Sequence, residues 1–442
     1  MKKMLLLLAA LFTTSGAQAI DLLSAYRDAL GYDAQISSAR AALGAGREKL
    51  PQGRAGLLPL VNLSANSAWN DIDYKARTDP SSENKVKYNS NGWSVALSQP
   101  LFRWQNWESY KQAELAVVQA EAQYELARQD LALRLAQTYF DVLLAEESLA
   151  SAQAQKKAIE EQLASAKRNF EVGTATITDT HEAQARFDLT TAQEIAATND
   201  LQVRRESLRT IIGKEAVAIK TLKPAAQIVR PQPDDIKQWV SSAESNNLAV
   251  QLGRAGLEIA SREIQKQRAG HYPTVDLVAT RGRNSQSDTL SVGRILPGSD
   301  TDITTVGVQL AIPLFAGGAI ASRGREAASM REKASADLDN ARRSAALSAR
   351  QAYLGVTSGL SQVKALEQAL VSSQSALDSN KLGYEVGVRI NIDVLNAQQQ
   401  LYATRRDLAK ARFDTLIAQL KLKAAAGALS EDDISAVNGL LE

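Results

Sequence analysis

The side chains with the clearest capacity for specific chemistry lie in two short segments of similar sequence, residues 170–179 and 384–393. The second segment carries Arg389, and the first carries Thr178 and Asp179. A guanidinium forms charge-assisted hydrogen bonds with carboxylate and hydroxyl oxygens, so Arg389 is a candidate for a link to Asp179 or Thr178. Simple helix capping by Thr178 or Asp179 is the competing interpretation. Both roles fasten structure, and neither is catalytic.

Catalytic, metal-binding and nucleic-acid-binding patterns are missing from the sequence. Its 442 residues include no cysteine and only two histidines, His181 and His271, neither of which has a second ligand at zinc-site spacing. No phosphate-binding or dinucleotide-binding glycine motif occurs. The net charge is +2, from 51 basic and 49 acidic residues, so no polybasic surface for nucleic acid is expected. We predict no enzymatic activity, no cofactor, no metal site and no nucleic-acid partner.

The two segments belong to an internal repeat. They are offset by 384 − 170 = 214 residues, about half of the chain. Such self-similarity is typical of architectures in which each unit supplies equivalent elements. The same offset relates Arg54–Gly56 to Arg268–Gly270 and Tyr139 to Tyr353, and an offset of 213 relates Pro100–Phe102 to Pro313–Phe315.

The N-terminus has the features of a secretory signal peptide. Lys2 and Lys3 precede an apolar run, Met4–Phe12, and a small-x-small cleavage site, Ala17–Ala19. A large, charge-balanced exported protein without cysteine fits a Gram-negative envelope. The predicted organisation is a signal peptide at 1–19 and one protomer at 20–442, comprising repeat 1 at about 20–214, a linker at 215–235, repeat 2 at about 236–427 and a C-terminal segment at 428–442.

Each half contains very long helices. Arg103–Glu171 has no proline and would span roughly 100 Å. Its predicted partner is Ile177–Ile212, and the second half repeats the pair as Ala319–Glu385 and Ile390–Ala426. A shorter helix is expected at Leu22–Leu50. The last helix has a seven-residue pattern typical of a tight coiled coil, with one row at Val394, Leu401, Leu408, Thr415 and Leu422 and a second at Ala397, Thr404, Ala411, Ala418 and Ala425.

Each half also predicts two strands of about ten residues. From Pro59 onwards apolar residues such as Val61 and Leu63 alternate with polar ones, and the period of two indicates one apolar face. Similar alternation follows near residues 93–98, 275–280 and 306–312. The polar stretches Asn70–Asn91 and Arg281–Thr304 are predicted as loops. Aromatic residues near the expected strand ends, Trp69, Trp93, Trp104 and Trp107, suit a membrane interface.

Four amphipathic strands match the spanning strands of an outer-membrane barrel, although a small soluble sheet is a competing interpretation. Four strands cannot close a barrel, for which eight is the practical minimum. Spanning strands would therefore require several chains to share one barrel. Two chains would leave a filled interior, and three could leave a pore.

The chain strongly resembles the TolC family of outer-membrane channel proteins over essentially its whole length. The resemblance rests on the two hairpin ends, Val172–Asp179 and Val386–Arg389, together with Tyr139-Phe140 and the segment Ile392–Leu395. It implies a membrane α+β fold built of two internal repeats. Three chains, each with four strands, would form a 12-stranded β-barrel continuous with a 12-helix α-barrel of coiled-coil hairpins that crosses the periplasm. The homotrimer follows from the resemblance, since the pore argument only favours three chains over two.

The resemblance also assigns a gate at the periplasmic end. Asp393 matches the first of two acidic rings in the family, where three carboxylates would attract cations. The second ring position falls on Asn396, which puts binding of polyvalent cations in doubt. In a simpler interpretation, Asp393 lies at the N-terminus of a helix, where its negative charge complements the helix dipole. The expected gate and constriction residues are Thr178, Asp179, Tyr384, Arg389, Asp393 and Asn396, and their links would hold the entrance closed until an iris-like untwisting opens it.

The hairpin ends are expected to be docking sites. Glycine permits the tight reversal between helices. The resemblance implies that small apolar ends meet a periplasmic adaptor, a membrane fusion protein, which is coupled to an inner-membrane transporter. The docking residues are Val172, Gly173, Thr174, Val386, Gly387 and Val388.

The predicted function is therefore an outer-membrane exit duct for a tripartite efflux pump or a type I secretion system, embedded in outer-membrane lipid. The cargo, drug or secreted protein, is not encoded in these residues. One alternative is a periplasmic coiled-coil structural protein without a channel, which would bury Val61, Leu63, Val95 and Leu97 inside one chain. Another, a self-contained diffusion porin, conflicts with the helix lengths and the four strands.

Overall fold

The structure is a computed structural model that describes residues 19–442 except 78–82, 216–217, 225 and 292–293. The predicted signal peptide therefore lies almost entirely outside the described residues. The chain forms two compact units, and each takes segments from both halves of the sequence. The helical unit comprises residues up to 41, 122–251 and 340–442, and the strand unit comprises 42–121 and 252–339.

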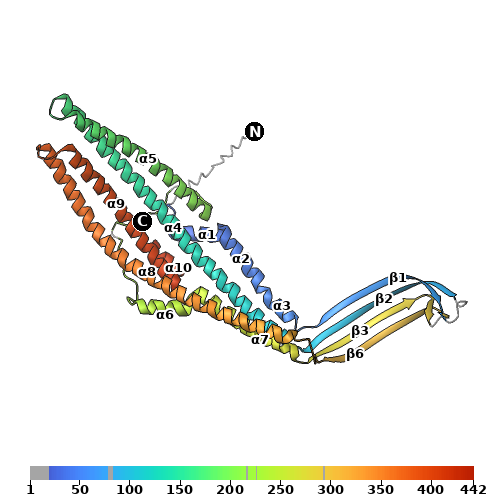
Figure 1. The fold of residues 1–442 in the computed structure, drawn as a ribbon. Coiled ribbons are helices and arrows are strands. Elements are labelled where there is room, and N and C mark those ends of the chain that lie inside the picture. The colour runs from blue at the N-terminus through green and yellow to red at the C-terminus, as the bar shows by residue number, and fades with distance from the viewer. Residues whose placement is uncertain (1–18, 78–82, 216–217, 225, 292–293) are drawn as a thin grey trace, which may run out of the picture. The chain divides into compact units, whose positions relative to one another are not determined.

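The strand unit contains a four-stranded antiparallel sheet in the order β1-β2-β3-β6 (Figure 1). The pairing of β2 with β3 joins the first half of the sequence to the second. A small hairpin of β4 and β5 lies between β3 and β6 in sequence. The strands are β1 Leu60–Lys75, β2 Glu83–Phe102, β3 Thr274–Gln286, β4 Thr289–Ser291, β5 Arg294–Leu296 and β6 Ser299–Ala311.

The apolar residues of the sheet share one face, as the alternation predicts. Val61 pairs with Leu97 and Leu63 pairs with Val95, so these four side chains lie on the same side of β1 and β2. Val61 is 58% exposed and Leu63 is 72% exposed. A structural protein with a closed core would bury these residues, so their exposure argues against that alternative.

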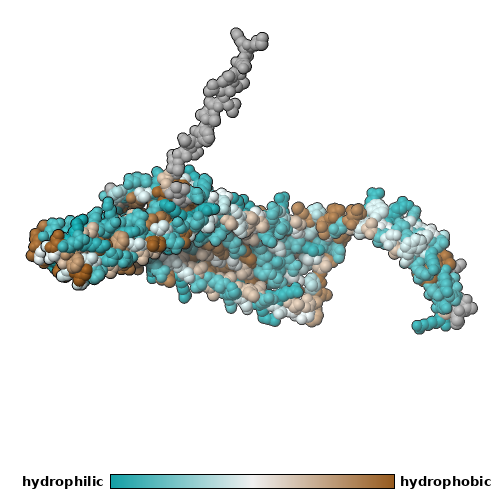
Figure 2. Space-filling view, turned by 90° about the horizontal axis from the view of Figure 1, so that it is seen from above, coloured by the Kyte–Doolittle hydropathy of each residue, from teal (hydrophilic) through white to brown (hydrophobic). Residues whose placement is uncertain are grey.

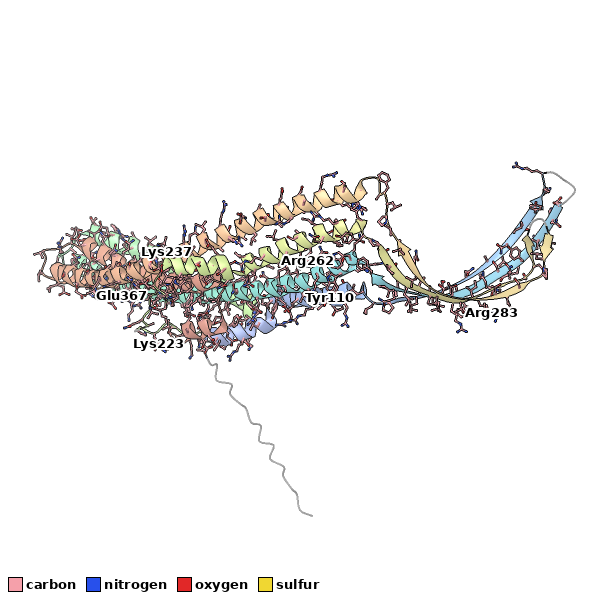
Figure 3. The ribbon with its side chains drawn as sticks, turned by 90° about the horizontal axis from the view of Figure 1, so that it is seen from below. Tyr110, Lys223, Lys237, Arg262, Arg283 and Glu367 are labelled. Atoms are coloured by element: carbon pink, nitrogen blue, oxygen red, sulfur yellow. The ribbon has the colours of Figure 1, made fainter. Side chains whose placement is uncertain are left out.

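The predicted loops Asn70–Asn91 and Arg281–Thr304 are wrong, because the strands continue far into both. Several of their polar residues form ion pairs between neighbouring strands. Cross-strand pairs of opposite charge stabilise a sheet, as cross-strand apolar pairs do. Lys87 lies 3.0 Å from Asp71. Arg283, labelled in Figure 3, donates to Asp300 at 2.6 Å.

Two of the predicted aromatic positions are also corrected by the longer strands. Trp69 lies within β1 and Trp93 lies in the middle of β2, so neither marks a strand end. Trp104 and Trp107 lie at the start of the helix that follows β2, next to the end of that strand, as expected.

The strands are longer than a bilayer requires. β1 has 16 residues and β2 has 20, whereas a tilted strand needs about 9–11 residues to span a bilayer.

The strand unit also contains helices, which connect to the ends of the strands (Figure 1). They are the last part of α2 (Ala34–Arg47), α3 (Lys49–Ala55), the first part of α4 (Trp104–Glu171), most of α7 (Leu248–Arg268) with the 3₁₀ turn η1 (Ala269–His271), and the first part of α8 (Ala319–Glu385). A Cβ atom on Gly53 would lie 2.6 Å from the Cβ of Ala113, so α3 and α4 nearly touch. Arg103 forms two hydrogen bonds, of 2.7 and 2.8 Å, with the buried carboxylate of Asp276. This ion pair fastens the start of α4 to β3.

The helical unit is built of two antiparallel hairpins (Figure 1). The first hairpin is the remainder of α4 with α5 (Ile177–Ile212), and the second is the remainder of α8 with α9 (Asn391–Ala425). The predicted bounds of all four helices are confirmed to within one residue. All five residues of the first predicted seam row of α9 are buried, and Thr404, Ala411 and Ala425 of the second row are buried too.

The predicted helix Leu22–Leu50 is wrong, because the chain forms α1 (Leu22–Tyr32), α2 and α3 there. Asp33 leaves the helical conformation, with φ −59° and ψ 127°. Its carboxylate accepts a hydrogen bond from the backbone N–H of Ile36 at 2.9 Å and two from Arg134 of α4. The break therefore depends on a partner that is 101 residues away in sequence.

The core of the helical unit contains Tyr139, Phe140 and Phe413, all buried, with the last two rings stacked 5.3 Å apart. Burial raises the pKa of the Tyr139 phenol, whose oxygen lies 3.0 Å from the carbonyl oxygen of Ile20 and 2.8 Å from that of Lys220. Single β-bridges join Ile20 to Ile219 and Leu222 to Leu441. The same unit contains α6 (Ile236–Asn246) and α10 (Glu431–Asn438). Among the described helices, none has the length and apolarity needed to cross a membrane.

Candidate functional site

The two hairpin ends have the same backbone geometry. Gly173 and Gly387 both adopt φ of 79°, a left-handed conformation that glycine adopts without strain. In both ends the residue that follows the glycine donates its N–H back to the preceding helix, from Thr174 to Asn169 at 2.8 Å and from Val388 to Gly383 at 2.9 Å. The repeat in sequence is therefore a repeat in turn structure.

The ends are apolar and exposed. Figure 2 shows hydrophobic residues gathered where the two hairpins end. All six predicted docking residues, Val172, Gly173, Thr174, Val386, Gly387 and Val388, are exposed in the described chain. Large exposed apolar side chains at such positions are typical of surfaces that meet a partner.

Asp179 caps its own helix. Its carboxylate accepts hydrogen bonds from the backbone N–H and the hydroxyl group of Thr176, at 3.0 and 2.8 Å. The backbone N–H of Asp179 donates in turn to the Thr176 hydroxyl oxygen at 3.3 Å, which completes a capping box. Thr178 is exposed and is not the cap. Capping, the alternative interpretation of this segment, is thus present, with Thr176 as the residue that the sequence interpretation missed.

Arg389 has a different partner from the one expected. Its guanidinium lies 3.7 Å from the carboxylate of Asp393, one turn further along α9. Among the described residues Arg389 forms no bond with Thr178 or Asp179. The capping box already occupies Asp179, and Arg389 in the turn just before α9 lies close to Asp393 in the first turn of that helix.

Other polar side chains join the two hairpins. Asn391 is fully buried and donates its amide N–H to the backbone oxygen of Asp179 at 3.4 Å, while its own side-chain oxygen accepts a hydrogen bond from Gln162. Asn169 donates to the hydroxyl oxygen of Tyr384 at 3.4 Å. These bonds place two of the predicted gate residues, Tyr384 and the backbone of Asp179, in contacts between the hairpins.

Comparison of the two repeats could have singled out Asn391 from the sequence. At the offset of 214 residues Asn391 corresponds to Ile177, which is exposed at the start of α5. A buried amide in one copy and an exposed apolar residue in the other indicate that the two hairpin ends are not interchangeable. Gln162 and Asn169 carry no comparable signal, because polar residues on long helices are most often solvated.

Arg186 of α5 makes another contact between the hairpins at this end. One of its nitrogens donates to the side-chain oxygen of Gln399 at 2.8 Å, and another donates to that of Asn396 at 3.0 Å. The predicted constriction residue Asn396 is therefore held by a side chain from the neighbouring hairpin. Asp393 lies one turn before it and is half-buried.

Ion pairs hold each hairpin together away from its end. In the first hairpin Lys156 donates to Glu194 at 2.8 Å, and this hydrogen bond lowers the pKa of the Glu194 carboxyl. In the second, Arg412 donates to Glu367 of α8, labelled in Figure 3, at 2.7 Å. Ion pairs thus stabilise each hairpin internally, and the polar contacts described above connect the first hairpin to the second.

The comparison with known proteins gives the family. The model of the family described as outer membrane efflux protein matches residues 25–214 and 239–428. The outer membrane protein TolC of Vibrio cholerae is 33% identical over 447 residues, which cover 100% of this chain and 99% of that protein. The proteases secretion protein PrtF of Dickeya chrysanthemi is 33% identical over 442 residues, covering 98% of this chain and 94% of PrtF.

A solved structure agrees with the fold. The CmeC outer membrane channel of Campylobacter jejuni has a TM-score of 0.80 to this chain at 16% identity, with coverage of 95% of this chain and 90% of that one. The match confirms a mostly helical channel fold with a four-stranded sheet in each chain. The chain therefore belongs to the outer membrane efflux protein family, as a TolC-like channel protein of the outer membrane.

Proposed function

We propose that three copies of this protein assemble into an outer-membrane exit duct for an efflux pump or a type I secretion system. The observation that carries the proposal is a sheet that is incomplete in one chain. β1 and β6 are the edges of the sheet and have no further strand partner among the described residues. Unpaired edges of this length are a liability unless another chain covers them, and four strands are too few to close a barrel.

Three sheets joined edge to edge would supply the twelve strands that leave an open pore. The apolar face with Val61, Leu63, Val306 and Val308 would then meet outer-membrane lipid, since each of these side chains is more than half exposed in one chain. The opposite face carries small polar residues, such as Ser64, whose hydroxyl oxygen lies 2.8 Å from that of Ser94 on the next strand. This polar face would line the duct.

The hairpins of three chains would form the twelve-helix cylinder that continues the duct through the periplasm. Helices this long need partners along their flanks, and neighbouring copies would supply them. Residues 215–235 and 428–442, which meet in the bridge between Leu222 and Leu441, would belong to a belt around this cylinder. The apolar hairpin ends would dock on a periplasmic adaptor that is coupled to an inner-membrane transporter.

The gate would lie where the hairpins converge, at Thr178, Asp179, Tyr384, Arg389, Asp393 and Asn396. In a trimer Asp393 would recur three times around the axis, each copy beside its own Arg389. The positive partner reduces the repulsion within such a ring. The cargo follows from the partner pump, and PrtF, a protease secretion protein by name, suggests secreted proteins as one class alongside drugs.

The first test measures assembly and conductance. We expect the mature protein to require detergent for extraction, to have the mass of a trimer when purified, and to form conducting channels in planar lipid bilayers. A compact monomer that is soluble without detergent would contradict the proposal. A monomeric channel would contradict the shared barrel but would leave transport intact.

A second test addresses the gate. The double substitution Arg389→Ser with Tyr384→Phe is expected to raise the conductance of the resting channel, because it removes the Asp393 partner and the acceptor for Asn169. We expect the conductance to increase a few-fold. The hydrogen bond from Asn169 to Tyr384 and the ion pair of Arg389 with Asp393 are both long, and Arg389 is exposed. Conductance in planar bilayers provides the measurement, and a value equal to that of the unsubstituted channel would exclude these residues from the gate.

A further inference from the structure

Arg186 joins the two hairpins through a charged side chain. It contributes two hydrogen bonds from one guanidinium, of 2.8 Å to Gln399 and 3.0 Å to Asn396, and both cross from α5 to α9. A planar guanidinium with two aligned donors fixes orientation as well as distance. The contact therefore favours one orientation of α9 against α5 near the hairpin ends, on a solvent-exposed surface.

The other contacts between the hairpins are longer or uncharged. The bonds from Asn169 to Tyr384 and from Asn391 to Asp179 are both 3.4 Å, and both have neutral donors. Hydrogen bonds with a charged donor are roughly twice as strong as neutral ones. Between α5 and α9, within the described residues, Arg186 is the one charged side chain that donates across.

The acceptors of Arg186 are neutral amides. Asn396 occupies the position at which the resemblance expects the second acidic ring, so Arg186 brings a positive charge to a place where negative charge is expected. The contact joins a guanidinium to two uncharged amide side chains. It also places a cation within reach of the entrance, beside the pair of Arg389 and Asp393.

We propose that Arg186 is the latch of the closed entrance: it holds α9 through Asn396 and Gln399, and both bonds must break before the second hairpin can move away from the first. This inference rests on the proposed function. It names a residue outside the predicted gate set, and it places a guanidinium beside Asn396, where the resemblance expects the second acidic ring. In a trimer three latches act at once.

The test compares two substitutions in the full-length protein. Arg186→Gln removes the positive charge and the pair of guanidinium donors. Arg209→Gln is the matched control on the same helix, because the Arg209 side chain bonds only to Glu206 of its own helix among the described residues. In planar bilayers we expect Arg186→Gln to raise the frequency of the open state on the order of ten-fold. We expect Arg209→Gln to behave like the unsubstituted channel.

Two further variants act from the opposite side of the contact. Asn396→Ala with Gln399→Ala removes both acceptors while Arg186 stays, and it should raise the open-state frequency to the same extent, which covers the case that Arg186→Gln does not assemble. Asn396→Asp supplies a charged acceptor and should lower the frequency below that of the unsubstituted channel.

A charge readout separates a latch from a general packing role. In Arg186→Gln with Asn396→Asp the new carboxylates are unpaired, and hexaamminecobalt(III) is expected to block this channel at a concentration at least about ten-fold lower than it blocks either single variant. Loss of packing alone would not create such a block. Equal block of the double and single variants would overturn the charge assignment.

The outcomes distinguish the two proposals. If the unsubstituted protein conducts and Arg186→Gln matches Arg209→Gln, the latch is overturned and the proposed function stands. If the unsubstituted protein forms no channel, the proposed function fails and the latch fails with it.

Discussion

Replacing Gly427 with alanine is expected to lower the melting temperature of the purified protein by several degrees. Gly427 follows α9 and adopts φ of 70°, with its N–H donated to Ala424 at 2.9 Å. A left-handed conformation costs a residue with a Cβ about 1–2 kcal/mol. The new Cβ would also overlap the backbone carbonyl of Asn246, with its carbon at 2.6 Å. Because these atoms are backbone, the helix end or α6 must shift.

The matched control for this prediction is Gly387→Ala. Gly387 has φ of 79°, but a Cβ built there meets nothing within 4 Å. It therefore carries the conformational cost without the overlap, and the difference between the two variants measures the overlap alone. Circular dichroism at 222 nm during heating in detergent gives both melting temperatures. Equal values would show that the contact between Gly427 and Asn246 relaxes at no cost.

Replacing Asp33 with alanine is the second change with a large expected effect. The Asp33 side chain is 5% exposed, and it is held by Arg134 with oxygen–nitrogen distances of 3.0 and 3.2 Å. Removing Asp33 leaves Arg134, among the described residues, with only the exposed carboxylate of Asp130 at 3.6 Å, so we expect a loss of about 3 kcal/mol in the free energy of unfolding. The substitution also removes the acceptor for the N–H of Ile36, at the start of α2.

Two variants resolve this effect into its parts. Asp33→Asn keeps an oxygen for the N–H of Ile36 and removes only the charge, so it should cost less than Asp33→Ala. Asp130→Ala is the control, because Asp130 lies 3.6 Å from the same Arg134 but is 65% exposed, and exposed pairs contribute little. A melting temperature for Asp130→Ala as low as that for Asp33→Ala would contradict the assignment.

The Asp33 pair also predicts a pH dependence. Burial by itself raises the pKa of the Asp33 carboxyl, but the hydrogen bonds from Arg134 and from the N–H of Ile36 outweigh it and lower the pKa overall. A lowered pKa in the folded state gives stability that is fully present above the unfolded value of about 3.9 and is lost as the pH falls through the folded value. The difference in melting temperature between the native protein and Asp33→Asn should therefore shrink between pH 7 and pH 3.

The long helices were predictable because their signals are local. Ala319–Glu385 is predicted with the bounds that α8 has, since the stretch contains no proline and corresponds through the repeat to Arg103–Glu171. The seven-residue pattern of α9 also predicted which residues are buried, including Val394 and Leu422. Periodicity and turn glycines act over a few residues, so a sequence read along one chain captures them.

The errors arose where a distant partner decides the structure. Asp71 looks like a loop residue until Lys87 lies opposite it, and Asp33 looks like a helix residue until Arg134 pairs with it. In both cases a charged side chain that would prefer solvent when unpaired is stabilised within the fold by a side chain of opposite charge. The polar composition of a segment does not reveal such a partner.

The amino-acid sequence by itself determined the repeat, the four long helices, the amphipathic strands and the two glycine turns, because each depends on neighbours within a few residues. Only the tertiary structure decided which polar groups join the hairpins. Arg186 and Asn396 are separated by 210 residues in sequence, and a helix face offers several polar side chains at each turn. The rotation and registry of α9 against α5 select one set of partners, and both depend on packing along the whole length of the hairpins.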